Sequence, residues 1–344
     1  MKTLRIKDIC DKGSSSLKQK DVENQNGAYP VFGASGLIGK IDIYHQNKDY
    51  IAIVKDGSGI GRVTFMPAFS SVIGTLQYIL PKEGFNIKYI SYCLQSLDLA
   101  HYKQGAAIPH IYFSDYGEYE VHVEENPDDQ QRIVSYLDAE FAKIEALKAN
   151  AEKQLQAAKD LFQAALKELL TPKEGWVNGI LSDIAIIMHG KNQKDVQNEL
   201  GHYPIYGSGG TIMGYADDYL CEAGTTILGR KGTINNPQYI GTRFWNVDTA
   251  FGISAKYDND NKFLFYLIKL EDWTKRNTGT TLPSLTQTVI ANVPISFPLK
   301  DEQQRIAARL DALSANVKAL QSNYTVTITL CNDLKQALLK KVFG

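Results

Sequence analysis

The segment Asp128-Asp129-Gln130-Gln131-Arg132-Ile133 decides how this chain is built, because a near copy of it stands later in the sequence. The copy is Asp301-Glu302-Gln303-Gln304-Arg305-Ile306, and Leu137-Asp138 and Leu310-Asp311 follow the two segments in the same way. Each segment opens a long run in which apolar residues recur every three or four positions. This recurrence predicts two copies of one structural unit, each ending in a helix.

An earlier block repeats at nearly the same spacing. The sequence YPVFGASGLIG at 29–39 returns as YPIYGSGGTIM at 203–213. Each copy therefore consists of a globular part followed by a helical part. Two copies predict pseudo-twofold symmetry and a function that meets its target twice.

The first long helix is predicted to start after Pro127, with Asp128 as its N-cap, and to end near Leu170, before Thr171-Pro172. A helix of about 40 residues would be a rod of roughly 60 Å. Its apolar residues form one heptad stripe, which requires a partner surface. The stripe consists of Val134, Leu137, Phe141, Ile144, Ala151, Leu155, Ala158, Phe162, Ala165 and Leu169.

The second long helix is predicted to start after Pro298 and to run to the carboxyl terminus. Local propensity in the β-branched segment 324–329 favours a strand, whereas the register of the repeat favours a helix, and we predict a helix. We expect the helices at 128–170 and 301–342 to run antiparallel and to bury their stripes against each other as a coiled coil. The second stripe consists of Leu310, Leu313, Val317, Leu320, Tyr324, Ile328, Cys331, Leu334, Leu338 and Val342.

The globular parts contain short apolar runs separated by glycine turns, which indicates strands. Helix patterns are sparse, and the better candidates are 87–97 and 263–270. The predicted fold class is α+β: two duplicated mixed α/β domains separated by two long antiparallel coiled-coil helices. The predicted boundaries are 1–127 for the first domain, 128–172 for the first helix, 173–299 for the second domain and 300–344 for the second helix.

Composition is that of an ordinary globular protein, with 344 residues, of which 44% are hydrophobic and 22% charged. No apolar run reaches the roughly 18 residues of a membrane span. The four cysteines are isolated from one another, which disfavours zinc ribbons and disulfide frameworks and fits a cytoplasmic location. The net charge of −1 lacks the basic excess typical of nucleic-acid binders, so a DNA-binding role requires Lys and Arg to be concentrated on one face.

The glycines of Gly33-Ala34-Ser35-Gly36-Leu37-Ile38-Gly39 resemble a dinucleotide-binding fingerprint, which would make the chain a stand-alone enzyme. That fingerprint needs a buried strand before it and a helix after it. Here the following residues 40–44 alternate like a strand, Pro30 stands where the preceding strand is needed, and the last glycine is Met213 in the second copy. A structural turn is therefore the better interpretation. Neither the histidines nor the carboxylates show a catalytic or metal-ligand spacing, so no active site and no metal site are predicted.

Polar and cationic residues near the glycine turns are the candidate contacts to DNA, because Arg, Lys, Gln and Asn bind phosphates and base edges. Both copies carry such residues at equivalent loops. For Lys55 and Lys231 we predict phosphate contacts, since lysine is a point charge, and for Arg230 base readout, since its fork fits guanine. The candidates are Lys55, Arg62, Lys103, Gln104 and His110 in the first copy and Arg230, Lys231, Lys275, Arg276 and Ser284 in the second.

Two loop motifs complete the pattern, Gly105-Ala106-Ala107-Ile108-Pro109 and Gly279-Thr280-Thr281-Leu282-Pro283-Ser284-Leu285. Each precedes a Val- or Ile-rich strand, a proline and the Gln-Gln-Arg-Ile helix start. With this ordered series present twice, the chain resembles over essentially its whole length the specificity (S) subunits of type I restriction-modification enzymes. The first copy departs from the second by having His110-Ile111 in place of Ser284-Leu285.

The resemblance implies a non-catalytic subunit in which each target-recognition domain reads one half of a bipartite DNA site and the helices set the spacing. It also implies double-stranded DNA and two methyltransferase subunits as partners, and it admits restriction subunits as further ones. S-adenosylmethionine, ATP and Mg²⁺ are then cofactors of the partner subunits only. The residues expected on the partner-binding helices are Gln131, Arg132, Phe141, Leu155, Gln304, Arg305, Val317 and Ile328. The alternative is a twin-domain protein–protein scaffold without DNA binding.

Overall fold

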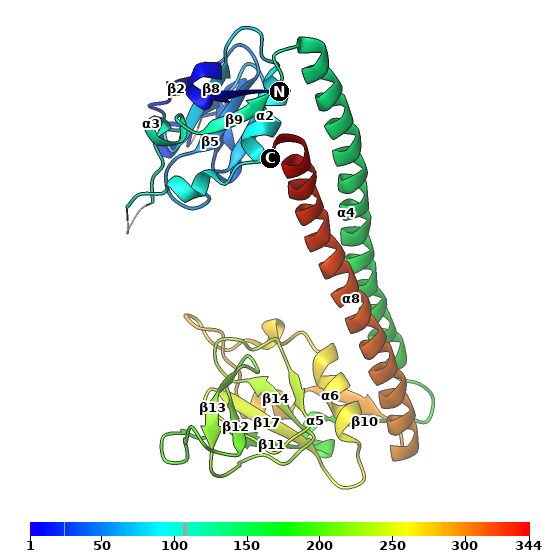
Figure 1. Cartoon of the computed structure of the whole chain (residues 1–344). Helices are drawn as coiled ribbons and strands as arrows, with labels where there is room; N and C mark the ends of the chain where they lie inside the picture. Colours follow the sequence, from blue (N-terminus) through cyan, green and yellow to red (C-terminus); the bar gives the residue numbers. More distant parts are fainter. Residues whose placement is uncertain (24, 106–108) are drawn as a thin grey trace. The chain divides into compact units, whose positions relative to one another are not determined.

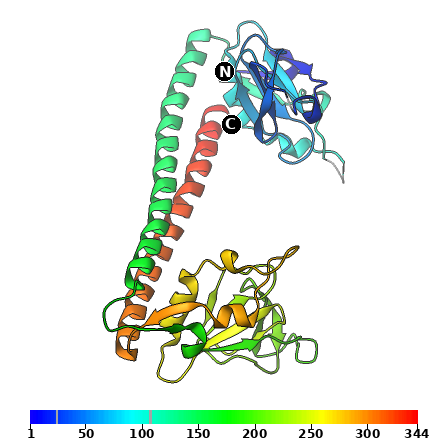
Figure 2. The same ribbon diagram turned by 180° about the vertical axis from the view of Figure 1, so that it is seen from behind.

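The computed structural model describes residues 1–23, 25–105 and 109–344. The chain forms two compact units, and each takes a part of both long helices (Figures 1 and 2). Unit 1 consists of Met1–Lys153 and Thr325–Gly344, and unit 2 of Gln154–Tyr324. Within the described residues no helix is both long and apolar enough to cross a membrane.

The globular part of unit 1 contains three small sheets with the strand orders β2-β8-β5-β6, β4-β3-β7 and β1-β9. Its central strand β5 is buried at every residue, which matches the apolar run in the sequence. The strands are β1 (Lys2–Arg5), β2 (Cys10–Ser14), β3 (Tyr29–Gly33), β4 (Gly36–Ile41), β5 (Tyr50–Val54), β6 (Val63–Met66), β7 (Ser71–Val72), β8 (Leu76–Pro81) and β9 (Glu120–Val123). The short helices are α1 (Ile6–Ile9), η1 (Gln19–Asp21), α2 (Ile87–Gln95), η2 (Leu99–Tyr102) and α3 (Phe113–Tyr116).

Unit 2 repeats these sheets strand for strand, with the orders β11-β17-β14-β15, β13-β12-β16 and β10-β18. Even the register shift recurs, between Val31 and Phe32 in β3 and between Ile205 and Tyr206 in β12. The strands are β10 (Val177–Ile180), β11 (Ala185–His189), β12 (Tyr203–Tyr206), β13 (Ile212–Ala216), β14 (Thr225–Gly229), β15 (Gln238–Ile240), β16 (Trp245–Asn246), β17 (Ala250–Ala255) and β18 (Pro294–Phe297). The short helices are α5 (Leu181–Ile184), α6 (Asn261–Leu270), η3 (Trp273–Arg276) and α7 (Gln287–Ala291). The predicted duplication and α+β class are confirmed.

The glycine-rich block is a hairpin turn. Strands β3 and β4 pair antiparallel around it, and Gly36 has a φ of +113°, a conformation that glycine adopts freely. Because a strand and not a helix follows the glycines, no helix N-terminus is available for a pyrophosphate, and the dinucleotide-binding alternative is wrong. A strand does form across Pro30, contrary to our argument from that residue. At Pro30 β3 has one partner only, since β7 pairs with Val31 and Phe32 alone.

The long helices are α4 (Pro127–Leu169) and α8 (Lys300–Phe343). Helix α4 begins at Pro127 itself, because the fixed φ and missing N–H of proline suit the first helical position. The expectation that Asp128 caps it is wrong: the Oδ1 atom of Asn126 accepts a hydrogen bond from the backbone N–H of Asp128 at 2.9 Å. Helix α8 runs unbroken through 324–329, as predicted. There the Thr329 hydroxyl donates to the carbonyl of Thr325, one turn back, at 3.1 Å, which helps a β-branched residue fit a helix.

The two helices pair antiparallel in both units. In unit 1, Lys335 of α8 forms an ion pair with Glu145 of α4, and Lys148 donates to Asn332 at 3.4 Å. In unit 2, the later residues of α4 share a core with the earlier residues of α8. The members of this core from the helices are Ala158, Phe162, Leu166, Leu169, Ile306, Ala307, Leu310 and Val317.

The buried stripes differ from the predicted ones at particular positions. Leu166 is fully buried although the predicted stripe omitted it, and Leu320 and Leu334 are exposed at 40% and 48%. An α-helix drifts against a strict heptad, so a long stripe rotates out of the interface. Near the helix ends the globular part replaces the second helix as the packing partner, and the Phe343 ring lies 5.2 Å from the ring of Tyr89. This explains why Phe343 is buried where we predicted Val342.

Candidate nucleic-acid interface

Two loops cross in unit 1, one following β5 and the other following η2. Their backbones are joined where they cross. The N–H of Ile111 donates to the carbonyl of Lys55 at 2.9 Å, and the N–H of Gly57 donates to the carbonyl of Pro109 at 3.0 Å. Gly57 has a φ of +82°, which lets its N–H turn toward the second loop.

The same crossing exists in unit 2, between the loop following β14 and the loop following η3. The N–H of Leu285 donates to the carbonyl of Arg230 at 2.8 Å, and the N–H of Gly232 donates to the carbonyl of Pro283 at 2.9 Å. Gly232 also has a φ of +82°. We call these two pairs of segments the crossing loops: 55–57 with 104–105 and 109–111, and 230–232 with 278–285.

The equivalent backbone hydrogen bonds of the two crossings align the two copies of the repeat residue by residue. Lys55 corresponds to Arg230 and His110 to Ser284, while Asp56 stands where unit 2 has Lys231. Asp56 accepts from the Nδ1 atom of His110 at 2.7 Å, and its second oxygen lies 3.5 Å from the Lys55 ammonium. The two copies therefore share a backbone framework but present opposite charges at one equivalent position.

The crossing loops of unit 1 bring together three of the five predicted residues: Lys55, Gln104 and His110. The backbones of Gln104 and His110 exchange two hydrogen bonds of 2.8 Å. Arg62 lies nearby and donates to the carbonyl of Ala34 in the β3–β4 turn at 2.8 Å. Lys103 is exposed, and in the described part of the chain no ion pair involves it. Residues 106–108 of the predicted loop motif lie outside the described residues.

In unit 2 the crossing loops bring together Arg230, Lys231 and Ser284. The Arg230 guanidinium donates to the carbonyl of Asp248 at 2.9 Å, whereas Lys231 is exposed and has no ion-pair partner among the described residues. Asn277, which the sequence analysis missed, accepts hydrogen bonds from the backbone N–H groups of Gly279 and Ser284, both at 2.8 Å, and so shapes the loop. Its position two residues before Gly279, in a polar turn sequence, was the available signal.

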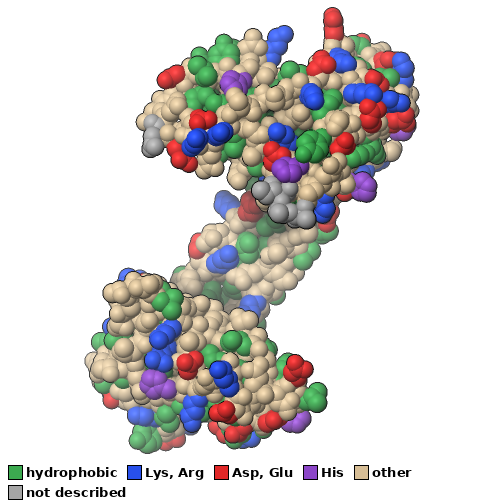
Figure 3. Space-filling view, turned by 90° about the vertical axis from the view of Figure 1, so that its left-hand side faces the viewer, with side chains coloured by type: hydrophobic (Ala, Val, Ile, Leu, Met, Phe, Trp, Pro, Cys, Tyr) green, Lys and Arg blue, Asp and Glu red, His purple; other side chains and the backbone are tan. Residues whose placement is uncertain are grey.

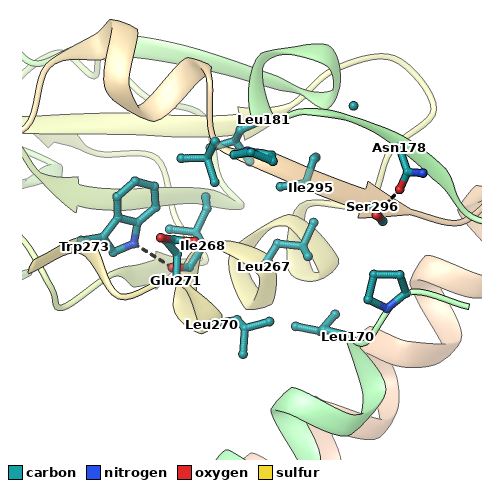
Figure 4. A pocket seen from close by; sticks show the side chains of 14 residues that line it. Leu170, Asn178, Leu181, Leu267, Ile268, Leu270, Glu271, Trp273, Ile295 and Ser296 are labelled. Carbon is teal, nitrogen blue, oxygen red and sulfur yellow. Dashed lines mark hydrogen bonds between the residues drawn. The ribbon is translucent and has the colours of Figure 1, made fainter. Parts of the chain in front are cut away.

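The two other predicted cations of unit 2 are engaged by carboxylates. Lys275 lies 3.6 Å from Asp272, and the Arg276 guanidinium bonds Glu271 at 2.8 Å. Glu271 lines a mainly apolar cavity of about 440 Å³ at the end of α6, which Figure 4 shows from close by. In it the indole N–H of Trp273 donates to the carbonyl of Ile268 at 2.8 Å. Arg276 is thus bonded to a residue of the cavity lining and lies outside the crossing loops.

The surface charge of the globular parts is mixed. In the face shown in Figure 3, Lys and Arg side chains of each unit are interspersed with Asp and Glu. No purely cationic face is visible in that view, so local loop cations, not a broad basic surface, are the candidate DNA contacts.

The predicted partner-binding residues fall into two groups. Gln131, Arg132, Gln304 and Arg305 are exposed on the first turns of the long helices. The other four point partly or wholly inward: Phe141, Leu155 and Ile328 are half-buried, and Val317 is 5% exposed in the core of unit 2. The side chain of Val317 is therefore occupied by its own chain.

Exposed apolar residues stand on both long helices at equivalent positions of the repeat. They are Ala157, Leu161 and Ala164 on α4, and Leu330, Leu334 and Ala337 on α8. Leu161 is 56% exposed, Leu330 59% and Leu334 48%. Since the spacing of three and four residues places each set on one side of its helix, we call them the helix stripes. The sequence analysis assigned Leu334 to the inner stripe and missed the others.

Each long helix is tied to its globular part by a buried glutamine that the candidate list omitted. The Oε1 atom of Gln130 accepts from the backbone N–H of Asn86 at 2.6 Å, and that of Gln303 accepts from the N–H of Asp260 at 2.9 Å. Both side chains are buried, at 0% and 1% exposure. The neighbouring Gln131 and Gln304, which we selected from the same motif, are exposed.

A globular part with crossing loops and a long helix with an apolar outer stripe, both present twice, define a two-site recognition protein. Comparison with known families is consistent with that class. The family model described as the type I restriction modification DNA specificity domain matches residues 1–157 and again 173–328. The chain belongs to this family.

Relatives with similar sequences are specificity subunits. A putative type I specificity subunit of Mycoplasma pneumoniae is 23% identical over 346 residues, covering 91% of this chain and 89% of the relative. The specificity subunit of the type I restriction enzyme EcoDI of Escherichia coli is 21% identical over 48% of this chain and 37% of its own length.

Solved structures share the fold over nearly the whole chain. A chain from a study of complex assembly and conformational transition in the type I R-M system has a TM-score of 0.78 at 16% identity, covering 99% of this chain and 96% of that one. The S subunit from M. genitalium has a TM-score of 0.51 at 17% identity, covering 100% and 96%. The HsdS subunit from Thermoanaerobacter tengcongensis has a TM-score of 0.53 at 15% identity, covering 99% and 95%.

Proposed function

We propose that this type I specificity subunit reads a bipartite DNA site, one half through the crossing loops of each unit, while the paired long helices fix the spacing and dock two methyltransferase subunits. The family match supports the general role, and its occurrence twice fits two half-sites. The observation that carries the detailed proposal is the backbone framework shared by the crossing loops. The two copies keep the framework and change its side chains, which is expected of two readers of different sequences.

The chemistry of the loops fits this division of labour. Arg230 is held at one guanidinium nitrogen by the Asp248 carbonyl, which leaves the rest of its fork for a base edge. Lys231 is an exposed point charge suited to phosphate. In unit 1, Asp56 stands in place of Lys231, and a carboxylate accepts from amino groups of cytosine rather than binding phosphate. Lys55 and the exposed Lys103 are the phosphate candidates of unit 1.

The first experiment compares Arg230→Ala, Lys231→Ala and the control Lys173→Ala, an exposed lysine in the segment that follows α4 and outside the crossing loops. Binding to specific and random duplexes is measured across a salt series. For Lys231→Ala we expect weaker binding to both duplexes and a salt slope smaller by about one, because one phosphate contact is lost. For Arg230→Ala we expect about 1–3 kcal/mol less affinity for the specific duplex only. Parental binding by both variants would remove this loop from the DNA interface.

The helix stripes are the proposed docking surface for the methyltransferase subunits. Each stripe exposes apolar side chains that its own unit does not cover, and the repeat provides one on each helix. A methyltransferase subunit with an apolar face could pack on each stripe, so the chain would bind two such subunits. On this proposal the chain carries no catalytic centre, and S-adenosylmethionine, ATP and Mg²⁺ act in the partner subunits. The assembly would work in the cytoplasm, where the four buried free cysteines remain reduced.

The second experiment places a charge in each stripe. Leu161→Glu and Leu334→Glu should each remove one methyltransferase subunit, and the double variant both, as measured by native mass spectrometry of the assembled complex. The control is Gln163→Glu, whose exposed side chain lies about 200° around the helix from Leu161. Assemblies of parental stoichiometry in the double variant would contradict docking at the stripes.

A further inference from the structure

The junction between each globular part and its long helix contains the same three polar side chains. In unit 1, whose helices α2 and α4 are labelled in Figure 1, the three side chains come from these two helices. The Asp138 carboxylate on α4 accepts from the Tyr92 hydroxyl and, at 2.9 Å, from the Lys88 ammonium, both on α2. In unit 2, Asp311 on α8 accepts from Tyr266 at 2.6 Å and from Lys262 at 3.2 Å, both on α6. We call these triads the helix clamps.

The geometry of each clamp is restrictive. Lys and Tyr stand four residues apart on the short helix, so they lie on one side of it and reach the same carboxylate of the long helix. A rotation of the short helix, or a slide along the long helix, separates at least one donor from the carboxylate. Apolar contacts alone restrict such a slide less strictly, because hydrophobic attraction is non-directional.

The surroundings favour a persistent contact. The Tyr92 ring packs edge-on against Phe141 of α4 at 5.3 Å, and the Tyr266 ring lies 5.0 Å from Phe265. Burial first, and then the Asp138 carboxylate, raises the pKa of Tyr92, so the hydroxyl stays a donor at all ordinary pH values. Burial opposes ionisation of Asp138, but hydrogen bonds from Tyr92 and Lys88 outweigh it and lower the pKa of that carboxyl.

The two copies keep the clamp unchanged while other surfaces diverge. All three side chains are identical in the two units, whereas the crossing loops have Asp56 opposite Lys231. Partly exposed ion pairs contribute little to the free energy of unfolding, so stability alone is a weak reason for that constancy. A protein that recognises two half-sites at a fixed separation needs a constant junction between each globular part and its helix, while the loops that contact the half-sites can vary.

We propose that the helix clamps are positioning elements that fix the angle of each recognition domain on its long helix, and thereby the DNA spacer length accepted between the two half-sites. This inference rests on the proposed function. The clamp residues act through the placement of the crossing loops and touch no base.

The test uses the full chain assembled with its methyltransferase subunits, with Tyr92→Phe, which deletes one hydroxyl, and Asp138→Asn. Tyr266→Phe is the matched variant of unit 2, and Tyr136→Phe, an exposed tyrosine of α4, is the control. Binding and methylation are measured on duplexes with the parental half-sites and spacers changed by one or two base pairs, and on duplexes with a single half-site. The preference for the parental spacer should fall about tenfold in the clamp variants, corresponding to one lost hydrogen bond to a charged group.

Single half-site binding of the clamp variants should remain parental, and thermal melting at neutral pH should fall only slightly, as expected for the loss of one partly exposed polar contact. Retention of the parental spacer profile by both Tyr92→Phe and Asp138→Asn would overturn the proposal. So would a loss of single half-site binding that accounts for the whole effect, because the clamp would then support only the fold. Failure of the proposed function is a separate outcome, in which the parental complex itself does not discriminate between spacers.

Discussion

Gln130 should be worth several kcal/mol to unit 1, although its sequence neighbour Gln131 should be almost dispensable. The Gln130 side chain is fully buried and makes three bonds: it accepts from the Asn86 N–H at 2.6 Å and donates to the carbonyls of Gly84 at 3.1 Å and Glu124 at 2.8 Å. Gln130→Leu keeps the side-chain volume nearly constant but leaves these three buried backbone groups without a hydrogen-bond partner. With about 1 kcal/mol for each bond and a further penalty for unpaired buried groups, we expect a loss of about 2–5 kcal/mol. Gln131→Leu should change the free energy of unfolding by less than about 0.5 kcal/mol, since that side chain is exposed.

Urea unfolding followed by two probes separates the units. All three tryptophans, Trp176, Trp245 and Trp273, lie in unit 2, so their fluorescence reports that unit, while circular dichroism reports both. Gln130→Leu should lower the circular dichroism midpoint by about 1–2 M and shift the fluorescence midpoint less. Gln303→Leu should shift the fluorescence midpoint instead. Equal midpoints for Gln130→Leu and Gln131→Leu would refute the assignment of the buried glutamine as the tie between helix and globular part.

Three further predictions follow from single positions. The buried Thr226 hydroxyl has no hydrogen-bond partner among the described residues, and the strand pairing places an apolar residue, Ile51, at the equivalent position of unit 1. Thr226→Val should therefore raise the stability of unit 2 by about 1 kcal/mol, seen as a higher fluorescence midpoint, and a lower midpoint would show a hidden partner. At Gly57 an added Cβ meets no atom within 4 Å, so Gly57→Ala should cost only the roughly 1–2 kcal/mol of a left-handed backbone. At Gly229 the Cβ would lie 1.9 Å from the Thr233 carbonyl oxygen, so Gly229→Ala should unfold the loop, and comparable melting temperatures of the two variants would contradict this. The pKa of Asp138 is lowered below its ordinary value of 3.8, so its ionised form stabilises unit 1 above pH 3.8, and this stabilisation is lost as the pH falls through the lowered pKa. The melting temperature of Asp138→Asn should therefore depend less on pH below about 4 than that of the parent. Identical acid profiles of the two proteins would count against the clamp.

The duplication, the long helices and the fold class could be predicted because each depends on a repeated or periodic pattern. The repeat register even overrode the strand propensity of 324–329. Patterns failed where neighbours decide the outcome. A heptad does not show that Leu334 faces outward while Leu339 is buried, since helix drift and the globular part determine which face is covered. The motif Gln-Gln likewise does not show which glutamine is buried, because that depends on where the helix starts on its domain.

The candidate interface was predicted in outline only. Loop glycines and cations indicated segments that meet in the fold, since the crossing loops bring Lys55 near His110 and Arg230 near Ser284, and their contact with DNA stays a prediction. The pairing of Asp56 with His110 and the engagement of Arg276 by Glu271 were not predictable, because both join segments that only the folded chain brings into register. Comparison of the two copies by sequence alone also matched the two basic loops, but it did not show that Asp56 and Lys231 occupy equivalent positions.

The crossing loops are held together at their intersections by main-chain groups, and this has an evolutionary consequence. Every residue type supplies a carbonyl and every type except proline supplies an N–H, so the scaffold tolerates replacement of most side chains that project from it. On the proposed function, new DNA targets can therefore arise by point mutation without loss of foldability. One lineage of such chains can accumulate many recognition sequences on a single architecture, each acquired independently in either half.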